Sequence, residues 1–404
     1  MTNTIPLKVF VDVNPSVNLK KGEKYSCVMM EDITPGRRYI HGKRKKLFRG
    51  GGAKFQTGDV LFARITPCLE NGKIAQFIEE QNEVGFGSTE FFIFRHREGI
   101  SDPAYIYYLA STDIVRKPAE KSMFGASGRQ RADLNVVKEV KVPSPPLPTQ
   151  RKIAAILSAY DDLIENNTRR IRILEEMAQA IYREWFIHFR FPGHENVSMV
   201  ESELGLIPEG WEVVRLGNLI EFKKGKKPNN YCLEDDIGSL PIFLIEGLNS
   251  GVTAFTSDKK LIIAEKDDVI MVMDGASSGK CYIRYYGALG STLGRYRSIN
   301  KSLLSPYHLF FTLDQNFRQI SDNNTGAAIP HANKDFINQI NILIPINDIR
   351  IQFHRIAENI LLLRENLRNR NINLCQQRDL LLPRLISGEL DVSELDIAVP
   401  EDVL

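Results

Sequence analysis

The stretch from Leu147 to Arg190 constrains the fold more than any other part of the chain. Apolar side chains recur there at alternating steps of three and four residues, the 3.5-residue period of a coiled-coil seam. The seam positions are Ile153, Leu157, Tyr160, Ile164, Asn167, Ile171, Leu174, Ala178, Ile181 and Trp185. No proline or glycine interrupts the pattern between Thr149 and Phe191. We therefore expect one helix of roughly 55–60 Å, whose apolar stripe needs a partner.

The C-terminal part of the chain repeats this pattern between about Ile351 and Leu382. The predicted seam of this second helix is Ile356, Ile360, Leu363, Leu367, Arg370, Leu374, Gln377 and Leu381. A proline stands seven residues before a glutamine at the start of both segments, at Pro143 and at Pro345. These correspondences predict an internal duplication.

The segments before the two helices share landmarks in the same order. Gly58-Asp-Val-Leu-Phe is echoed by Lys266-Asp-Asp-Val-Ile-Met, and Gly87-Ser-Thr is echoed by Gly290-Ser-Thr. Short β-like runs bounded by glycine turns predict a mixed α/β domain in each copy.

The order of the copies predicts an α+β fold: two similar mixed α/β domains separated by two long helices that pair as an antiparallel coiled coil. The helices should run antiparallel because the second begins where the second domain ends, near the finish of the first helix. We expect Asn167 and Arg370 to meet and to help set the register, at some cost in stability. The predicted segments are a first domain at 1–146, a central helix at 147–190, a linker at 191–204, a second domain at 205–345, a C-terminal helix at 346–390 and a tail at 391–404.

Composition limits the class of protein. The chain has 404 residues, 43% of them hydrophobic, and contains no run of 18 apolar residues that would predict a membrane span. The first residues lack the pattern of a signal peptide, and the five cysteines form no C-x-x-C pair, so we expect a cytoplasmic protein with reduced thiols. The seven histidines show no metal-ligand spacing, which predicts no metal site.

No sequence motif supports a catalytic centre. Gly275–Lys280 is one residue short of a phosphate-binding loop and is followed by Cys281 where serine or threonine should stand. Leu147 takes the aromatic position of the Ser-Pro-Pro-aromatic loop found in amino-methyltransferases, where it cannot stack on a flipped base. We therefore predict a chain without catalytic residues of its own.

Clusters of basic residues are the best indication of function, although such a run is also typical of a solvated loop. The segment from Ile33 to Gly58 contains no acidic residue, and the second domain has a basic run of its own. Lysine and arginine gathered on one surface can contact the phosphates of nucleic acid even when the net charge is only +2. The predicted phosphate contacts are Arg37, Arg38, Lys43, Arg44, Lys45, Lys46, Arg49 and Lys54, then Lys223, Lys224, Lys226 and Lys227.

Base reading should fall to arginine and polar side chains in nearby loops. The candidates are Arg64, Arg129, Gln130 and Arg131 in the first domain, and Lys280, Arg295, Arg297, His331 and Asn333 in the second. For each of these residues taken singly, the alternative interpretation is a polar surface side chain that does not contact DNA.

The arrangement of two globular domains, each followed by a long helix, resembles the specificity subunit of type I restriction-modification systems. Four segments carry the resemblance: Pro143–Gln150, Gly58–Arg64, Ala126–Arg131 and Leu380–Leu390, the last with its Leu-Ile-Ser-Gly-Glu sequence. Each motif is weak alone, whereas their order and duplication make the set specific.

The resemblance implies a non-catalytic reader of double-stranded DNA with a bipartite, asymmetric target. Each globular domain would be a target recognition domain, and the helices would dock two methyltransferase subunits, with restriction subunits joining for cleavage. The chain itself would bind no cofactor, and S-adenosylmethionine, ATP and magnesium would be bound by the partners. Two alternatives stay open at this point: a specificity chain whose partner fuses methyltransferase and nuclease, and a coiled-coil adaptor without a role on DNA.

Overall fold

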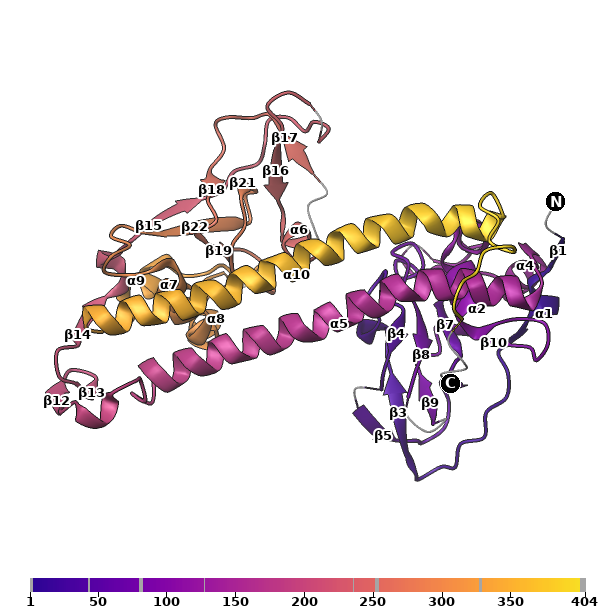
Figure 1. The fold of residues 1–404 in the computed structure, drawn as a ribbon, viewed down its shortest axis with the longest axis horizontal. Coiled ribbons are helices and arrows are strands. Elements are labelled where there is room, and N and C mark those ends of the chain that lie inside the picture. The colour runs from indigo at the N-terminus through magenta and orange to yellow at the C-terminus, as the bar shows by residue number, and fades with distance from the viewer. Residues whose placement is uncertain are drawn as a thin grey trace. The chain divides into compact units, whose positions relative to one another are not determined.

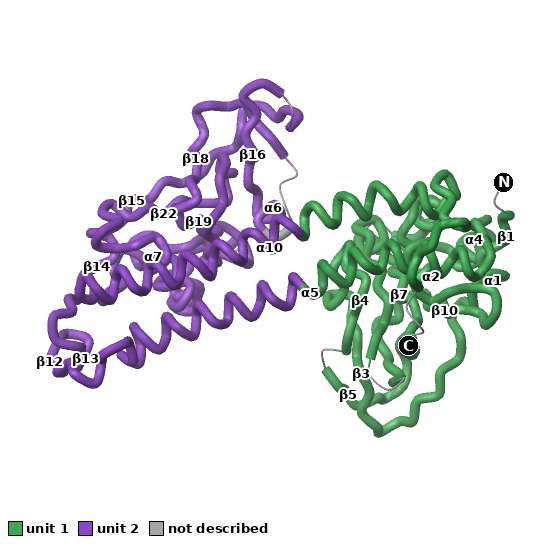
Figure 2. The backbone as a smooth tube through the Cα atoms, viewed as in Figure 1, with its two compact units in different colours: residues 1–166, 371–404 green, residues 167–370 purple. Residues whose placement is uncertain are grey.

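The chain folds into two compact units, which Figure 2 shows in separate colours. The computed structural model describes residues 3–42, 44–79, 83–126, 128–234, 236–250, 254–326 and 329–399. Unit 1 combines residues 1–166 with 371–404, and unit 2 is the continuous segment 167–370. Among the described helices, none is both long and apolar enough to cross a membrane.

Unit 1 is built on two antiparallel-rich sheets, with strand orders β2-β10-β7-β8-β4 and β5-β3-β9-β6, and a short pair β1-β11 (Figure 1). Its strands are β1 (Thr4–Pro6), β2 (Val11–Val13), β3 (Lys24–Val28), β4 (Tyr39–Ile40), β5 (Arg44–Leu47), β6 (Ala53–Gln56), β7 (Val60–Ala63), β8 (Ile74–Phe77), β9 (Val84–Gly87), β10 (Phe91–His96) and β11 (Lys141–Pro143). Its short helices are α1 (Leu7–Phe10), η1 (Met30–Asp32), α2 (Pro103–Ser111), α3 (Asp113–Lys121) and α4 (Leu134–Glu139).

Strand β7 shows why unit 1 has an apolar cluster on each face of its larger sheet. All four residues of β7 are buried, and successive side chains point to opposite faces of the sheet. Val60 and Phe62 pack in the cluster that contains Tyr105 and Tyr108 of α2. Leu61 packs in a second cluster on the other face. The uninterrupted apolar run is therefore the mark of a strand that is covered on both sides.

Unit 2 repeats this plan with strand orders β15-β22-β19-β20, β17-β16-β21-β18, β14-β23 and β12-β13. Its strands are β12 (Met199–Ser202), β13 (Gly205–Pro208), β14 (Glu212–Arg215), β15 (Ile220–Lys224), β16 (Leu240–Phe243), β17 (Phe255–Thr256), β18 (Ile263–Ala264), β19 (Val269–Val272), β20 (Cys281–Ile283), β21 (Gly287–Leu289), β22 (Leu293–Ser298) and β23 (Asn341–Ile344). Its short helices are η3 (His194–Asn196), η4 (Leu216–Asn218), α6 (Ile245–Ser250), α7 (Pro306–Gln315), α8 (Phe317–Asp322) and α9 (Lys334–Gln339).

The topology confirms the predicted duplication. The order β2-β10-β7-β8 in unit 1 corresponds to β15-β22-β19-β20 in unit 2, and α2, α3 and α4 correspond to α7, α8 and α9. In both units an early strand also pairs with the strand that precedes a long helix: Ile5 pairs with Val142, and Val214 pairs with Ile342. The α+β fold of two similar domains and two long helices is as predicted.

The two long helices, α5 (Leu147–Phe186) and α10 (Asn347–Ser387), pass through both units, and their halves pair antiparallel inside each one. In unit 1, the side chain of Arg378 donates to Asp161 at 2.5 Å, and that of Asn371 donates to the carbonyl of Ile164 at 3.3 Å. In unit 2, Arg364 lies 3.5 Å from Glu175, while the ring centroid of Phe353 lies 4.8 Å from that of Phe186. In both units the residue number on α10 falls as the number on α5 rises.

At every second position of the α10 seam, the residue that faces inward is the one that follows the predicted residue. Leu363 is 42% exposed, and Arg370 and Gln377 are also exposed, so the assignment of these three residues to the seam was wrong. The buried positions instead recur every seven residues, at Ala357, Arg364, Asn371, Arg378 and Leu385. The prediction followed apolarity, whereas three polar side chains fill these positions because protein groups satisfy their hydrogen bonds.

The other predicted seam positions lie inward. Leu367 of α10 is buried, and Ile356, Ile360, Leu374 and Leu381 are half-buried. On α5, the buried positions are Ile153, Leu157, Ile164, Asn167, Ala178 and Trp185, and the half-buried ones are Tyr160, Ile171, Leu174 and Ile181. Asn167 is buried as expected, whereas Arg370 is exposed and its neighbour Asn371 is the buried residue at this level of α10; that Asn167 and Arg370 help to set the register stays a prediction.

Candidate nucleic-acid interface

In unit 1, Phe124 and Arg131 bound a loop and pair with each other through their backbones, and Arg131 also bridges to Ile65, just beyond the end of β7. The backbone N–H groups of Phe124 and Arg131 each donate to the carbonyl of the other, at 3.1 and 2.9 Å. The N–H of Gln130 donates to the side-chain oxygen of Thr66 at 3.0 Å. These bonds hold the predicted readers Gln130 and Arg131 in a defined place, with the exposed Arg129 beside them.

Glu90 gathers two arginines at the base of this loop. Arg131 donates to the Glu90 carboxylate through both Nε and Nη2, at 2.9 and 2.6 Å. Arg64 approaches the same carboxylate at 3.5 Å, and its guanidinium lies 5.1 Å from the ring centre of Phe92. The hydrogen bonds from Arg131 lower the pKa of Glu90, so this carboxylate is charged at neutral pH.

Arg64 also lines a cleft of about 450 Å³ in unit 1. The polar lining side chains are Asn14, Ser16, Asn18, Lys54, Arg64 and Thr89, and the remaining lining residues are Pro15, Val17, Gly52, Ala53, Phe91 and Ile93. A cleft that offers amide, hydroxyl and cationic groups together can hydrogen-bond to base edges and to phosphate oxygens.

Unit 2 has a corresponding loop from Thr325 to His331. The N–H groups of these two residues again donate to each other's carbonyls, at 2.9 and 2.7 Å. His331 takes the place of Arg131, and its Nδ1 lies 2.7 Å from Asp274. The ammonium of Lys224, which is one of the predicted phosphate contacts, lies 3.1 Å from the same carboxylate.

Most of the first basic run is exposed. Arg44, Lys45 and Lys46 lie on β5, an edge strand whose four residues are all exposed, and Lys45 pairs with Glu83 at 3.0 Å. Arg49 is exposed, while Arg37 and Lys54 are half-buried; Lys43 lies outside the described residues. The three consecutive glycines after Arg49 have φ values of +105°, +78° and +76°, which side-chain-bearing residues rarely adopt. The cationic strand is thus followed by a turn that needs its glycines.

The second basic run is exposed as well. Lys223 pairs with Glu221 at 3.0 Å, and Lys226 and Lys227 are exposed on the segment that follows β15. Lys280 is exposed and lies over the ring of Tyr282 at 5.3 Å.

Arg38 is not a phosphate contact, contrary to the prediction. Its side chain is buried, and it donates to Gln76 at 2.8 Å, to Tyr108 at 3.3 Å and to Ser158 of α5. The guanidinium also lies 4.7 Å from the ring centre of Tyr39. Arg38 therefore fastens β4 and β8 to two helices inside unit 1.

Two of the predicted readers in unit 2 are structural arginines. Arg297 donates to both oxygens of Asp268 at 2.6 Å, and unit 1 has the same bidentate pair in Arg95 and Asp59. Arg295 is 7% exposed and donates to Glu221 at 2.8 Å. Their charges are satisfied by protein carboxylates on adjacent strands.

Asn333, another predicted reader, has a structural role as well. Its side-chain oxygen accepts hydrogen bonds from the backbone N–H groups of Asp335 and Phe336, at 3.0 and 3.2 Å, and so caps helix α9. Asp133 caps α4 of unit 1 in the same way, through the N–H of Asn135.

The uncharged polar residues of the cleft and the carboxylates of Glu90 and Asp274 were not predicted from the sequence. Asn14, Ser16 and Thr89 belong to none of the basic runs. The repeated Gly-Ser-Thr at 87–89 and 290–292 was the available signal for Thr89, because it marks the same turn in both copies. Nothing in the sequence pattern pointed to Glu90 or Asp274.

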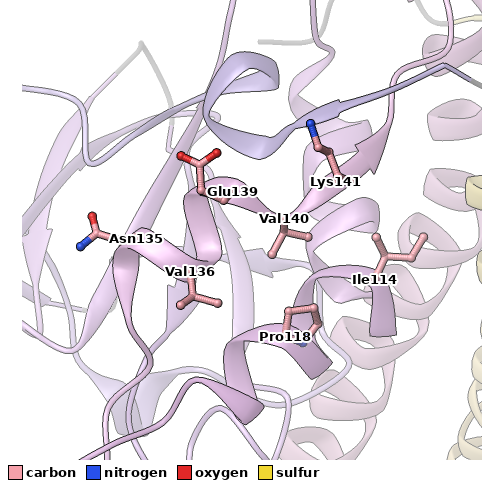
Figure 3. A pocket seen from close by; sticks show the side chains of 7 residues that line it. All are labelled: Ile114, Pro118, Asn135, Val136, Glu139, Val140 and Lys141. Carbon is pink, nitrogen blue, oxygen red and sulfur yellow. The ribbon is translucent and has the colours of Figure 1, made fainter.

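A second hollow of unit 1, with a volume of about 660 Å³, has a different chemistry. It is lined by Ile114, Pro118, Asn135, Val136, Glu139, Val140 and Lys141 (Figure 3). Its residues come from α3, from α4, from β11 and from Val140 between the last two; α3 and α4 stand just before Phe124 and just after Arg131 in the sequence. Over the described part of the chain, no three histidine, cysteine or acidic side chains gather as a metal site would require.

Comparison with known proteins agrees with this two-copy architecture. A family model described as the type I restriction modification DNA specificity domain matches residues 13–176 and again residues 208–361. The chain is 29% identical to the type I restriction enzyme MjaIX specificity subunit of Methanocaldococcus jannaschii over an alignment of 303 positions that covers 72% of this chain and 70% of that protein. It is 22% identical to the HindI specificity subunit of Haemophilus influenzae over 412 residues, covering 82% of this chain and 86% of that one.

A solved structure is similar in fold. The S subunit of a type I restriction-modification system from M. genitalium matches with a TM-score of 0.52 and 17% identity, over 95% of this chain and 96% of that one. The two family matches together take up more than half of the residues. The chain therefore belongs to the type I restriction modification DNA specificity family.

Proposed function

We propose that the chain is the non-catalytic DNA-recognition subunit of a type I restriction-modification complex, and that each unit reads one half of a bipartite, asymmetric DNA target. One observation carries the proposal. The specificity-domain match falls on both copies, and each copy presents a fixed loop that carries a cationic or ionisable side chain at the same topological position, Arg131 or His331.

The two loops support an asymmetric target because their chemistry differs. A guanidinium such as that of Arg131 suits the two acceptors of guanine, whereas an imidazole such as that of His331 offers one donor or one acceptor. The exposed cations of β5 and of the segment after β15 would contact phosphates, which position the protein without reading sequence.

The long helices would dock the partner subunits. Both carry large apolar side chains outside the seam: Leu163, Ile173 and Met177 of α5 are 54%, 50% and 48% exposed, and Leu380 of α10 is 72% exposed. Two methyltransferase subunits covering such side chains would bring S-adenosylmethionine, and restriction subunits would bring ATP and magnesium. The complex would act in the cytoplasm.

The test is an exchange of the globular part of unit 2. Residues 205–345 are replaced by the matching segment of a related chain, and the methylated sequence is determined across the DNA of a host that also expresses the methyltransferase. One half of the methylated sequence should change and the other half should stay. A change in both halves, or no sequence-specific methylation by the unaltered chain, would contradict the proposal.

A further inference from the structure

Each unit holds two basic side chains of its candidate interface on a single carboxylate. In unit 1, Glu90 binds Arg131 at 2.6 Å and Arg64 at 3.5 Å. In unit 2, Asp274 binds His331 at 2.7 Å and Lys224 at 3.1 Å. All four side chains are ones that the sequence marks as candidates for contact with DNA.

The two carboxylates come from different places in the duplicated fold. Glu90 directly precedes β10, whereas Asp274 follows β19, the counterpart of β7. The residue that corresponds to Asp274 is Ile65, since Ile65 bridges to Arg131 as Asp274 bridges to His331. The two copies therefore reach the same charge arrangement with an acid from a different strand, so the arrangement is more than a remnant of duplication.

These pairs differ from the structural pairs of the same sheets. The structural carboxylates Asp59 and Asp268 are each 1% exposed. Glu90 and Asp274 are 19% and 18% exposed, and their basic partners are 32% to 50% exposed. These basic side chains thus face solvent while each of them contacts a neighbouring carboxylate.

We infer that Glu90 and Asp274 set sequence selectivity by competing with DNA phosphates for these four basic side chains. This inference rests on the proposed function and deepens it. On unrelated DNA these side chains can contact only phosphates, and each such contact must draw them away from the carboxylate, so the carboxylate weakens that binding. At the target site the same side chains hydrogen-bond to the correct base edges while they stay on the carboxylate, so binding of the target does not carry this loss.

The test uses the full chain in complex with its methyltransferase subunits. Glu90→Gln and Asp274→Asn each remove one negative charge with little change of shape. Binding is measured for the target duplex and for an unrelated duplex at several salt concentrations. Each variant should bind the unrelated duplex roughly three- to tenfold more tightly, with a slope of log K against log salt that is steeper by about 0.9 per freed cation. The ratio of target to unrelated affinity should fall.

Two control variants separate this effect from a general change of charge. Asp12→Asn frees Arg97 in unit 1, and Asp267→Asn frees Lys301 in unit 2; both pairs are exposed and lie outside the two loops. Neither control should alter the affinity ratio. Adding Arg131→Gln to Glu90→Gln should remove the part of the gain that comes from Arg131 and leave only the smaller part that comes from Arg64.

Three outcomes decide the matter. Controls that raise binding of the unrelated duplex as much as the loop variants would overturn the inference. So would loop variants that lose target binding while their binding of unrelated DNA and their salt slope stay unchanged, because the carboxylates would then position or read bases. An unaltered complex without any sequence preference would instead refute the proposed function itself.

Discussion

Arg378 and Asp161 form the ionic pair of unit 1 whose loss should be felt most. Their side chains are only 7% and 3% exposed, and Asp161 also accepts a hydrogen bond from Tyr108 at 2.6 Å. Replacing Arg378 by alanine leaves a buried carboxylate without its cation, which costs about 3–5 kcal/mol in comparable cases. We expect a loss of that size in the free energy of unfolding, measured by urea titration.

An exposed pair on the same helix system provides the control. Arg172 lies 3.6 Å from Glu176 on α5, and both side chains are more than 60% exposed, at 73% and 66%. Arg172→Ala should cost less than about 1 kcal/mol. Equal decreases in the free energy of unfolding of the two variants would show that burial does not make the Arg378 pair more stabilising than the exposed pair.

His308 makes unit 2 sensitive to acid. The imidazole is 2% exposed and its ring centre lies 4.3 Å from that of Phe186. Burial lowers the pKa of His308 to about 3, from an ordinary value of 6.5. Between these values the unfolded chain binds the proton and the folded chain does not, so stability is complete above pH 6.5 and falls as the pH drops.

The corresponding measurement compares the unaltered chain with His308→Leu. The difference between their free energies of unfolding should be constant above pH 7. Below pH 6.5 the unaltered chain should lose up to about 1.4 kcal/mol per pH unit relative to the variant. A difference that stays flat down to pH 4 would mean that His308 titrates normally in the folded protein.

Whether a given arginine reads DNA could not be predicted from its own position. Arg131 and Arg297 look alike in the sequence, yet Arg297 shares its charge with an aspartate that is 1% exposed and Arg131 with a partly exposed glutamate. The difference lies in partners 29 and 41 residues away. The basic runs are therefore visible in the sequence, but whether a given arginine is exposed or paired in the interior is not.

At the scale of elements, β5 offers a test of sequence-independent binding. Its exposed Arg44, Lys45 and Lys46 lie on a sheet edge. Replacing the basic segment Lys43–Lys46 by alanines should weaken binding to target and unrelated duplexes alike. Each lost phosphate contact should flatten the salt slope by about 0.9.

A matched control removes cations elsewhere in unit 1. Lys117 and Lys121 of α3 and Lys141 of β11 are exposed too. Their replacement by alanines should leave the salt slope nearly unchanged. If the β5 variant keeps its full affinity and slope, then β5 is merely a solvated strand.

The period of the long helices was predictable, and the phase of the second was not. A 3.5-residue repeat predicts that two helices pair, but it does not decide which of two neighbouring residues faces inward. On α10, the apolar Leu363 stands beside Arg364, and only the tertiary structure shows that Arg364 turns inward to donate to the carbonyl of Ile283 at 2.9 Å. The duplicated domains were recognisable because glycine turns and strand cores recur in the same order in both copies.

At the scale of the whole molecule, the duplication predicts how half a chain should behave. A fragment that ends near Ser198 keeps the first domain and all of α5 but lacks residues 371–397. In the complete chain, Leu385 and Ile386 from that missing part pack with Ile153 and Leu157. Each large apolar side chain left uncovered forgoes roughly 1.5–3 kcal/mol, so the fragment should not stay monomeric.

A second copy can supply the missing cover. By the 200-residue correspondence of the two helices, Trp185 and Phe186 of one copy would take the places of Leu385 and Ile386 against the other. The contact is isologous and closes on itself as a dimer. With methyltransferase subunits, this dimer should methylate an inverted repeat of one half-site. Light scattering of a monomer, or methylation of a non-palindromic site, would count against the duplication as the basis of assembly.

The division of unit 1 between two distant segments also has a consequence for synthesis on the ribosome. Residues 371–404 emerge about 200 residues after residue 166, which at 5–20 residues per second is a delay of roughly 10–40 seconds. Unit 2 is continuous and has its whole sequence available before that delay ends. A nascent chain can therefore fold unit 2 before unit 1 has received residues 371–404, which complete it. During that interval the apolar face around Ile153 and Leu157 is open to chaperones or to a neighbouring nascent chain.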